Sequence, residues 1–423
     1  MSQIRPNILL IVFDSLSEQV CQSRCKDLPA LAGFRNGSRC FTKAYAPSPE
    51  SGPATASLFT GLDMAVHGVW TGGVALPERE TTLAQRLADH GYATALVGRR
   101  HLAGVSNWTT EHARPFEYAN FDWAHGPLHR SRQNAYLNWL QQVAPDAYAT
   151  IFPAQANPDD TEIQNWQHKA LTALPDALSF NHWVGGRIAS QCAQQSGEEP
   201  FLAVAGFVIG EAMGAAPDPA SPGEPINQTA LRQADAALGA ILQGLEHAGR
   251  ADTTAVVVTA ARGTIADAGS PMQESALHVP LMIRAPGHVA QTVDTMVSTL
   301  DLAATVFDLA RVTPPRRMQG TSLMADNIDD VARGWALSRL RHPAHDWQTA
   351  LRMARWKLVM THGHPKADTR SKFSLFDLLT DPDETRDLAD APPHQATLER
   401  MVDLMIDARV ALEDRTEPRI AKF

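Results

Sequence analysis

The sequence predicts an α/β fold with a large, mostly parallel sheet flanked by helices and followed by a smaller C-terminal α+β subdomain. Short apolar runs rich in β-branched residues recur along the chain, and amphipathic stretches separate them. Runs of this length between helical segments favour buried parallel strands with crossover helices. The five runs are residues 8–13, 93–97, 201–207, 255–259 and 279–283.

The first predicted unit is strand, helix, strand. The run at 8–13 is closed by Asp14, is too short for a membrane anchor, and has no small-residue cleavage site after it. We therefore expect a strand there and neither a signal peptide nor a membrane span. Residues 82–90 gather their apolar side chains on one helical face, and Gly91 follows as a helix-ending residue would. The strand at 93–97 completes the unit.

The pattern divides the chain into an α/β domain at 1–312 and an α+β subdomain at 313–423. An irregular insertion is expected at about 108–178, where His, Gln, Asn, Trp and Pro are frequent, and we place it over one side of the sheet near a pocket mouth. Residues 214–225 are dense in Pro, Gly and Ala, which predicts a loop. The subdomain shows two strand-like pieces, RWKLVM and SLFDLL, and then a helix from about 394 to 413.

Composition excludes several classes of protein. Hydrophobic residues make up 44% and charged residues 20% of the 423, which is ordinary for a globular protein with a large core. The net charge of −9 argues against a general nucleic-acid or anionic-membrane binder, although a local basic pocket remains compatible with it. Four cysteines are too few for a disulfide framework, so we expect reduced thiols and a cytoplasmic protein. They are Cys21, Cys25, Cys40 and Cys192.

Polar side chains follow the predicted strands. Asp14 comes after the first strand, Arg99 and His101 after the second, Glu211 after the third and Arg262 after the fourth. Ligands of open α/β sheets bind beyond the carboxyl ends of the strands. We therefore expect these side chains to converge on one site.

Seven stretches, in order along the chain, resemble the sulfatase branch of the alkaline phosphatase superfamily, which includes arylsulfatases and phosphonate monoester hydrolases. The resemblance spans nearly the whole chain and implies the alkaline phosphatase-like (sulfatase) fold. The stretches are PNILLIVFDS, SGPATASLFTG with the following HGV, GYATALVGRRHL, DTTAVVVTAARG, HVPLMIRAPG, VSTLDLAATVFDLA and SLFDLLTDPDETRDLA.

The chain departs from the family at the metal site. Four family residues, two aspartates after the first strand and an Asp-His or Asp-Asn pair after a later one, hold a divalent cation, usually calcium. Here Asp14 keeps the first position, while Ser15, Ala261 and Arg262 take the others. A hard cation needs several oxygen ligands, and a guanidinium beside it repels it by roughly 4 kcal/mol at about 4 Å and an effective dielectric of 20. We therefore expect no resident metal ion.

The nucleophile motif departs as well. In the family, the first residue of C/S-x-P-x-R is converted to formylglycine. This chain has SGPAT at 51–55, so Thr55 replaces the arginine on which the conversion depends, and we expect Ser51 to stay unmodified. A plain Ser51 hydroxyl without a metal or an adjacent base is expected to be inert.

Other family positions are partly kept. Arg99 stands where the family has lysine, and His101 retains the family histidine; both contact the ester group in active relatives. The planar fork of an arginine favours bidentate contact with an anion. A further family histidine is replaced near Glu211, and a second lysine has no counterpart in GSPMQES.

Two interpretations of the altered site remain open. In the first, Arg262 replaces the cation, pairs with Asp14, and leaves an anion-binding pocket with Arg99, His101 and Ser51 that binds a small sulfate-, phosphate- or carboxylate-bearing ligand. In the second, Asp14 and Arg262 form only a structural ion pair in a closed pocket.

Three functions follow from these interpretations. The chain is a sulfatase homologue that binds an anion without cleaving it, an active ester hydrolase with Ser51 as nucleophile and His101 as acid or base, or an interaction subunit of an active relative. The sequence also allows a homo-oligomer. We expect His67 to be a packed loop histidine, and we interpret His125 and His129 as surface residues before pocket residues.

Overall fold

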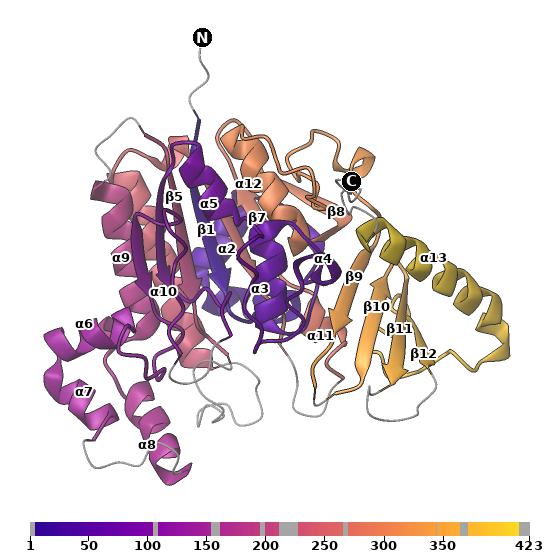
Figure 1. Cartoon of the computed structure of the whole chain (residues 1–423), viewed down its shortest axis with the longest axis horizontal. Coiled ribbons are helices and arrows are strands. Elements are labelled where there is room, and N and C mark those ends of the chain that lie inside the picture. The colour runs from indigo at the N-terminus through magenta and orange to yellow at the C-terminus, as the bar shows by residue number, and fades with distance from the viewer. Residues whose placement is uncertain are drawn as a thin grey trace, which may run out of the picture.

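The fold is built on an eight-stranded, mostly parallel sheet (Figure 1). The computed structural model describes residues 5–104, 109–153, 161–194, 199–210, 227–264, 270–343, 345–363 and 371–413. In sheet order the strands are β4 (Asn120–Trp123), β3 (Ala93–Gly98), β5 (Phe201–Phe207), β1 (Asn7–Phe13), β6 (Thr254–Ala260), β7 (Leu281–Arg284), β2 (Arg39–Tyr45) and β8 (Gln291–Ser298). The predicted fold class is therefore confirmed.

One predicted strand runs in the other direction. β7, expected as a parallel strand at 279–283, pairs antiparallel with both β6 and β2. The described part of the connection from β6 contains only the four-residue helix α11 (Glu274–Leu277). Such a helix is too short to return the chain to the opposite end of the sheet, which a parallel strand requires.

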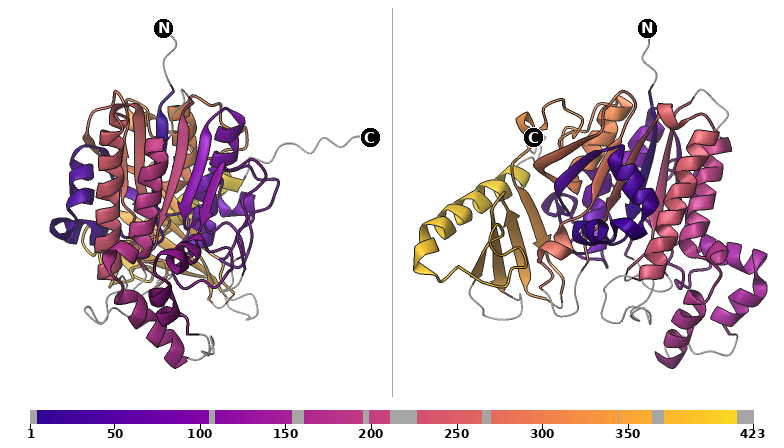
Figure 2. Two further views of the ribbon diagram at one scale, coloured as in Figure 1. Left: turned by 90° about the vertical axis from the view of Figure 1, so that its left-hand side faces the viewer. Right: turned by 180° about the vertical axis from the view of Figure 1, so that it is seen from behind.

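Helices cover both faces of the sheet, as Figure 2 shows. On one face α9 (Phe180–Gln194) packs against α10 (Gln228–His247), and α10 packs against α2 (Pro29–Asn36). On the other, α12 (Leu302–Ala310) contacts α3 (Ser51–Thr60) and α5 (Leu83–Asp89). Their buried apolar stripes and the strands form one continuous core. The short helices α1 (Glu18–Ser23) and α4 (Met64–His67) lie beside these layers.

The predicted strand–helix–strand unit is confirmed. α5 begins after Thr82, whose side chain accepts a hydrogen bond from the backbone N–H of Gln85, and Gly91 follows with φ +79°. That φ suits glycine, which has no Cβ to clash in the left-handed region.

The segment predicted as an irregular insertion is more regular than expected. It contributes the edge strand β4, which pairs in parallel with β3. It also forms the helices α6 (Ala135–Val143), α7 (Pro145–Ile151) and α8 (Thr161–Thr172), which project beyond the sheet in Figure 1. These helices are short, and α8 is largely polar, which makes a helical pattern harder to recognise in the sequence.

A second, antiparallel sheet forms the C-terminal part. Its order is β12 (Lys372–Asp377), β11 (Trp356–Gly363), β10 (Trp347–Arg352) and β9 (Ala336–Leu340). The predicted final helix is α13 (Gln395–Glu413), which packs on β11 and β9. The boundary placed at residues 312 and 313 stays a prediction.

Two smaller findings complete the fold. No helix in the described ranges is long and apolar enough to cross a membrane. All four cysteines are free thiols. The loop predicted at 214–225 lies outside the described residues.

Candidate functional site

The carboxyl ends of three strands bring predicted residues to one edge of the sheet. Phe13, at the end of β1, lies in register with Ala260, at the end of β6. Asp14 and Arg262 therefore follow neighbouring strand ends, at the lower edge of the sheet in Figure 1. Arg99 follows β3, which joins the same sheet through β5. The helix α3 and the loop after β3 complete this edge.

Ser51 and His101 form the central contact of the site. Ser51 is the first residue of α3, and its Oγ lies 2.7 Å from Nδ1 of His101. His101 is therefore adjacent to Ser51, as the ester-hydrolase alternative requires of its base. The base comes from a loop 50 residues further along the chain, so no local spacing in the sequence indicated the pair.

His101 is a partly buried, neutral hydrogen-bond acceptor on the cavity wall. Burial is the largest cause that lowers the pKa of His101 to about 3, and the charges of Arg99 and Arg262 lower it further. A hydrogen bond between the imidazole and the backbone of Gly72 raises the pKa of His101 instead, which means that the ring is the donor. A Cβ built on Gly72 would lie 3.7 Å from Nε2. We assign the proton to Nε2, which leaves Nδ1 to accept from the Ser51 hydroxyl.

Arg99 contacts both members of this pair. Its Nη2 lies 3.2 Å from Ser51 Oγ and 3.0 Å from His101 Nδ1, while Nη1 donates to the His125 carbonyl at 3.2 Å. The preceding Gly98 has φ +92°, and a Cβ there would meet a backbone oxygen at 2.3 Å. Only glycine permits this turn. A fixed positive charge is thereby placed against the Ser51 hydroxyl.

The turn that carries His101 is held by a carboxylate that the sequence did not indicate. His101 has φ +70°, which is uncommon for a residue with a side chain. Glu111 accepts hydrogen bonds from the backbone N–H groups of His101 at 3.0 Å and Leu102 at 2.9 Å. Glu111 lies in the segment predicted as an irregular insertion, and neither its spacing nor its neighbours set it apart.

A cavity of about 370 Å³ opens beside Ser51 and His101. Arg262 lines it, and so do side chains from the loop after β9, in the second sheet. These C-terminal residues were not expected at the site, because nothing near them in the sequence links them to Ser51. The lining residues are Pro49, Glu50, Ser51, Gly52, Thr71, Gly72, Gly73, His101, Arg262, Pro271, Leu340, His342 and His345.

Asp14 and Arg262 lie near each other in the fold but do not form the predicted ion pair. Asp14 Oδ1 accepts hydrogen bonds from three backbone N–H groups, including those of Ile209 at 2.9 Å and Gly210 at 3.3 Å. Arg262 is only 7% exposed and donates to the Gly263 carbonyl at 3.4 Å. Both residues are described, and no hydrogen bond or ion pair joins them. Backbone donors satisfy the Asp14 carboxylate instead.

The donor set does not fit the calcium site of the family. Ser15 and Ala261 supply no carboxylate, and Asp14 already has one oxygen engaged. Within the described ranges, no three His, Cys, Asp or Glu side chains are placed to hold a metal ion. Calcium takes about six to eight oxygen ligands. Glu211, the remaining predicted polar position of this edge, lies outside the described residues.

The other histidines divide into two groups. His67 is fully buried with both ring nitrogens hydrogen-bonded, so its interpretation as a packed histidine is confirmed. The interpretation of His125 and His129 as surface residues is wrong. The His125 ring lies edge-on to His101 with centroids 4.9 Å apart, and His129 lies 5.2 Å from His125 and is 7% exposed. They pack beside the site because β4 and the turn after it fold against β3.

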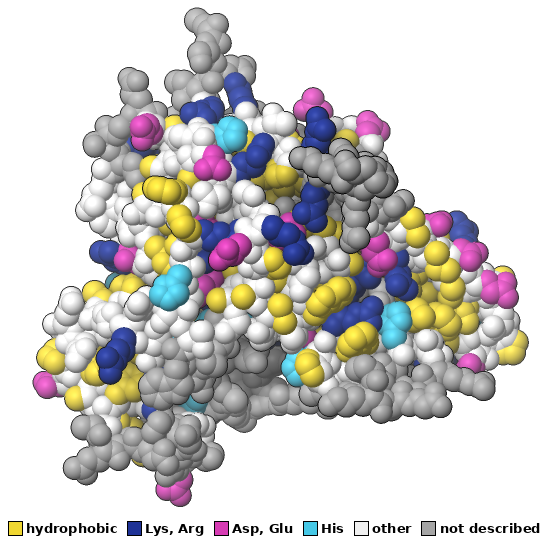
Figure 3. Space-filling view, viewed as in Figure 1, with side chains coloured by type: hydrophobic (Ala, Val, Ile, Leu, Met, Phe, Trp, Pro, Cys, Tyr) yellow, Lys and Arg dark blue, Asp and Glu magenta, His cyan; other side chains and the backbone are white. Residues whose placement is uncertain are grey.

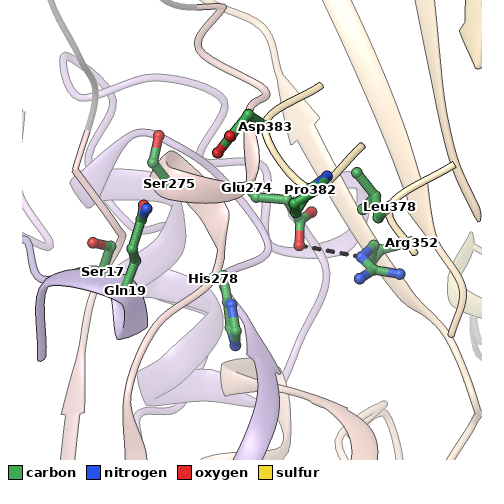
Figure 4. A pocket seen from close by; sticks show the side chains of 9 residues that line it. All are labelled: Ser17, Gln19, Glu274, Ser275, His278, Arg352, Leu378, Pro382 and Asp383. Atoms are coloured by element: carbon green, nitrogen blue, oxygen red, sulfur yellow. Dashed lines mark hydrogen bonds and ion pairs between the residues drawn. The ribbon is translucent and has the colours of Figure 1, made fainter. Parts of the chain in front are cut away.

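A second cavity, of about 240 Å³, lies between the two sheets, and both acidic and basic side chains line it (Figure 4). Glu274 and Arg352 form an ion pair on its wall, with Nε and Oε2 3.2 Å apart. Figure 3 shows Lys and Arg side chains gathered over the junction of the two sheets, despite the overall negative charge. The Glu274–Arg352 pair satisfies both charges within the protein, which indicates a structural role for this wall of the cavity.

Comparisons with known proteins agree with this architecture. The sulfatase family model matches residues 6–208 and 225–312, and the model "N-sulphoglucosamine sulphohydrolase, C-terminal" matches residues 270–411. Among relatives, the uncharacterized sulfatase YidJ of Escherichia coli is 25% identical over 366 residues, which are 76% of this chain and 71% of YidJ. Arylsulfatase K of Bos taurus is 24% identical over 453 residues, covering 91% of this chain and 78% of that protein.

Solved structures show the same fold. The phosphonate monoester hydrolase of Agrobacterium radiobacter superimposes with a TM-score of 0.74 at 19% identity, covering 99% of this chain and 97% of that one. The phosphonate monoester hydrolase of Silicibacter pomeroyi gives a TM-score of 0.73 at 20% identity, covering 96% and 95%. The two family models together span both sheets, and this chain belongs to the sulfatase family.

Proposed function

We propose that this protein binds a small tetrahedral anion, either free or as an ester of sulfate, phosphate or phosphonate, without a resident divalent cation. The observation that supports this most is the cluster of Ser51, His101 and Arg99 at hydrogen-bond distances. Ser51 and His101 share the wall of one cavity with Arg262, and Arg99 lies directly behind them. Two guanidinium groups and a hydroxyl are suited to the oxygens of such an anion. The N-terminus of α3, ten residues long, adds a favourable dipole at Ser51.

The charge of the site supports binding without a metal. In the family, carboxylates gather around a cation and the cation attracts the anionic ester. Here Ala261 replaces the aspartate of the later pair and Arg262 replaces its histidine or asparagine, so a positive side chain is present where the family has a neutral ligand of the cation. An anion therefore meets positive charge directly. The names of similar proteins, arylsulfatase K and phosphonate monoester hydrolase, support a sulfate- or phosphonate-type ligand.

Binding of inorganic phosphate and sulfate is expected to be independent of divalent cations. Isothermal titration calorimetry on protein treated with EDTA should give the same dissociation constant as titration in excess Ca²⁺. Elemental analysis of the purified protein should find no stoichiometric calcium, magnesium, manganese or zinc. Binding that appears only when Ca²⁺ is added would contradict the proposal.

Ester hydrolysis is the second candidate function, and the Ser51–His101 hydrogen bond favours it. His101 Nδ1 can take the hydroxyl proton as Ser51 Oγ attacks the sulfur or phosphorus, and can return that proton to the departing ester oxygen. Water then attacks the sulfur or phosphorus of the Ser51 ester, His101 takes its proton, and His101 gives that proton to Ser51 Oγ as the ester bond breaks. Arg99 is placed to stabilise the developing charge.

The pH profile distinguishes this mechanism from one with an ordinary histidine. The base must be neutral, and with a pKa of about 3 His101 remains neutral at pH 5. The hydrolysis rate of 4-nitrophenyl sulfate, phosphate and phenylphosphonate esters is therefore expected to stay flat between pH 5 and 8. An unperturbed histidine would lose activity below about pH 6.5. Cleavage that persists in Ser51→Ala would exclude Ser51 as the nucleophile.

A further inference from the structure

The backbone of His101 adopts a conformation that surrounding groups must hold in place. Its φ of +70° lies in the left-handed region, which is unfavourable for a residue with a Cβ. Such conformations persist when neighbouring contacts determine them. The imidazole reaches Ser51 from this turn, so the backbone conformation decides where Nδ1 lies.

Glu111 supplies those contacts with both carboxylate oxygens. Oε2 accepts from the backbone N–H of His101 at 3.0 Å and from the indole of Trp123 at 3.2 Å. Oε1 accepts from the N–H of Leu102 at 2.9 Å and from Nε of Arg100 at 2.7 Å. The Glu111 side chain is 1% exposed, so water cannot replace any of these donors.

Arg100 pairs with Glu111 and also with a second buried carboxylate, Glu117, which allows the two glutamates to be compared. Its Nη1 pairs with Glu117 at 2.7 Å, and the Glu117 side chain is fully buried. Glu117 accepts its other hydrogen bonds from Thr82 and from the backbone of Arg114. Glu111 and Glu117 therefore share one cation and a similar burial, but only Glu111 touches the backbone that carries His101.

We propose that Glu111 is a positioning residue that holds His101 Nδ1 against Ser51, acting through the backbone of the 101–102 turn. The expected effect on anion affinity rests on the proposed function, since displacing the imidazole and the Ser51 hydroxyl would weaken the anion site. The positioning role also predicts a purely structural result, the orientation of the His101 ring, which does not depend on any ligand.

The test compares Glu111→Gln with the matched variant Glu117→Gln. Both remove one charge next to Arg100, and both are expected to lower the thermal midpoint. In ¹⁵N-histidine-labelled protein, the wild-type His101 ring should show a protonated Nε2 and a bare Nδ1, assigned by the signals that disappear in His101→Gln. Glu111→Gln should shift the Nδ1 signal or mix the two tautomers, while Glu117→Gln should leave it unchanged. Phosphate affinity should fall about tenfold in the first variant and less than about twofold in the second.

Two results would overturn the inference. One is an unchanged His101 ring signal in Glu111→Gln. The other is an equal change in both variants, which would reduce Glu111 to a stabilising residue. If the wild-type protein does not bind phosphate, the proposed function fails, but the ring signals still decide the positioning role. Should Glu111→Gln not fold, Glu111→Asp and Glu117→Asp allow the same comparison, because the shorter side chain keeps the charge and withdraws it from the turn.

Discussion

Replacing Lys357 by methionine is expected to reduce the free energy of unfolding by about 3–5 kcal/mol, because the substitution leaves two buried carboxylates without their shared cation. Lys357 lies on β11 with no exposed side-chain surface, and its Nζ is 2.6 Å from Glu384 and 3.2 Å from Glu274. Glu384 Oε2 also accepts the backbone N–H of Glu274 at 2.7 Å. The network joins the second sheet to α11 and so to the main domain.

The pKa directions of the two carboxylates show how the cations are shared. Burial opposes ionisation of Glu274, but Lys357 and Arg352 together outweigh it and hold its pKa at about 2. For Glu384 burial is again the largest cause and prevails over Lys357, so the pKa of Glu384 is raised. Glu274 has two cations nearby, whereas Glu384 has one that it shares.

Urea unfolding at two pH values provides the measurement for Lys357→Met. Without the lysine, the pKa of Glu384, which burial already raises, should rise further, so the native state gains a proton first as pH falls. Stability of the variant should therefore increase from pH 8 to pH 5, and its deficit against wild type should shrink. Lys43→Met is the control, because it breaks the Lys43–Asp294 pair, in which the Asp294 side chain is 72% exposed, and should scarcely move the midpoint. Equal urea midpoints for the two variants would contradict the role of Lys357 as the buried cation that Glu274 and Glu384 share.

Replacing Arg99 by methionine is expected to weaken phosphate binding by about tenfold to a hundredfold, which corresponds to about 1.5–3 kcal/mol for hydrogen bonds to a charged group. Arg99 places one guanidinium nitrogen within 3.2 Å of Ser51 Oγ and 3.0 Å of His101 Nδ1. Its loss removes both the charge and the two donors. Calorimetric titration with inorganic phosphate measures the change.

Arg99→Lys is the matched variant, because it restores the residue type usual in the family and keeps the charge. It lacks the planar fork that contacts Ser51, His101 and the His125 carbonyl together, so an intermediate affinity is expected. The pKa of His101 should rise in Arg99→Met, since one of the charges that lower it is removed. Wild-type affinity in Arg99→Met would show that the anion does not bind beside Ser51.

The strand pattern was predictable because it follows from local periodicity. The runs at 8–13, 93–97, 201–207 and 255–259 all form strands of the main sheet, and each is buried on both faces. Position after a strand end was enough to select Asp14, Arg99, His101 and Arg262. The strands β2 and β8 were missed because polar residues interrupt both of them, RCFTKAY and QTVDTMVS, so neither shows a continuous apolar run.

By itself, the sequence determined the α/β class, the family, and the residues that line up at the strand ends, because motifs and apolar periodicity are local properties of a chain. Only the tertiary structure decided that His101 lies against Ser51, that Glu111 holds the His101 turn, and that backbone N–H groups satisfy Asp14. Each of these contacts joins residues from separate elements, with distances set by packing. A hydrogen bond depends on fractions of an ångström, and no spacing along the chain encodes a separation in space that finely.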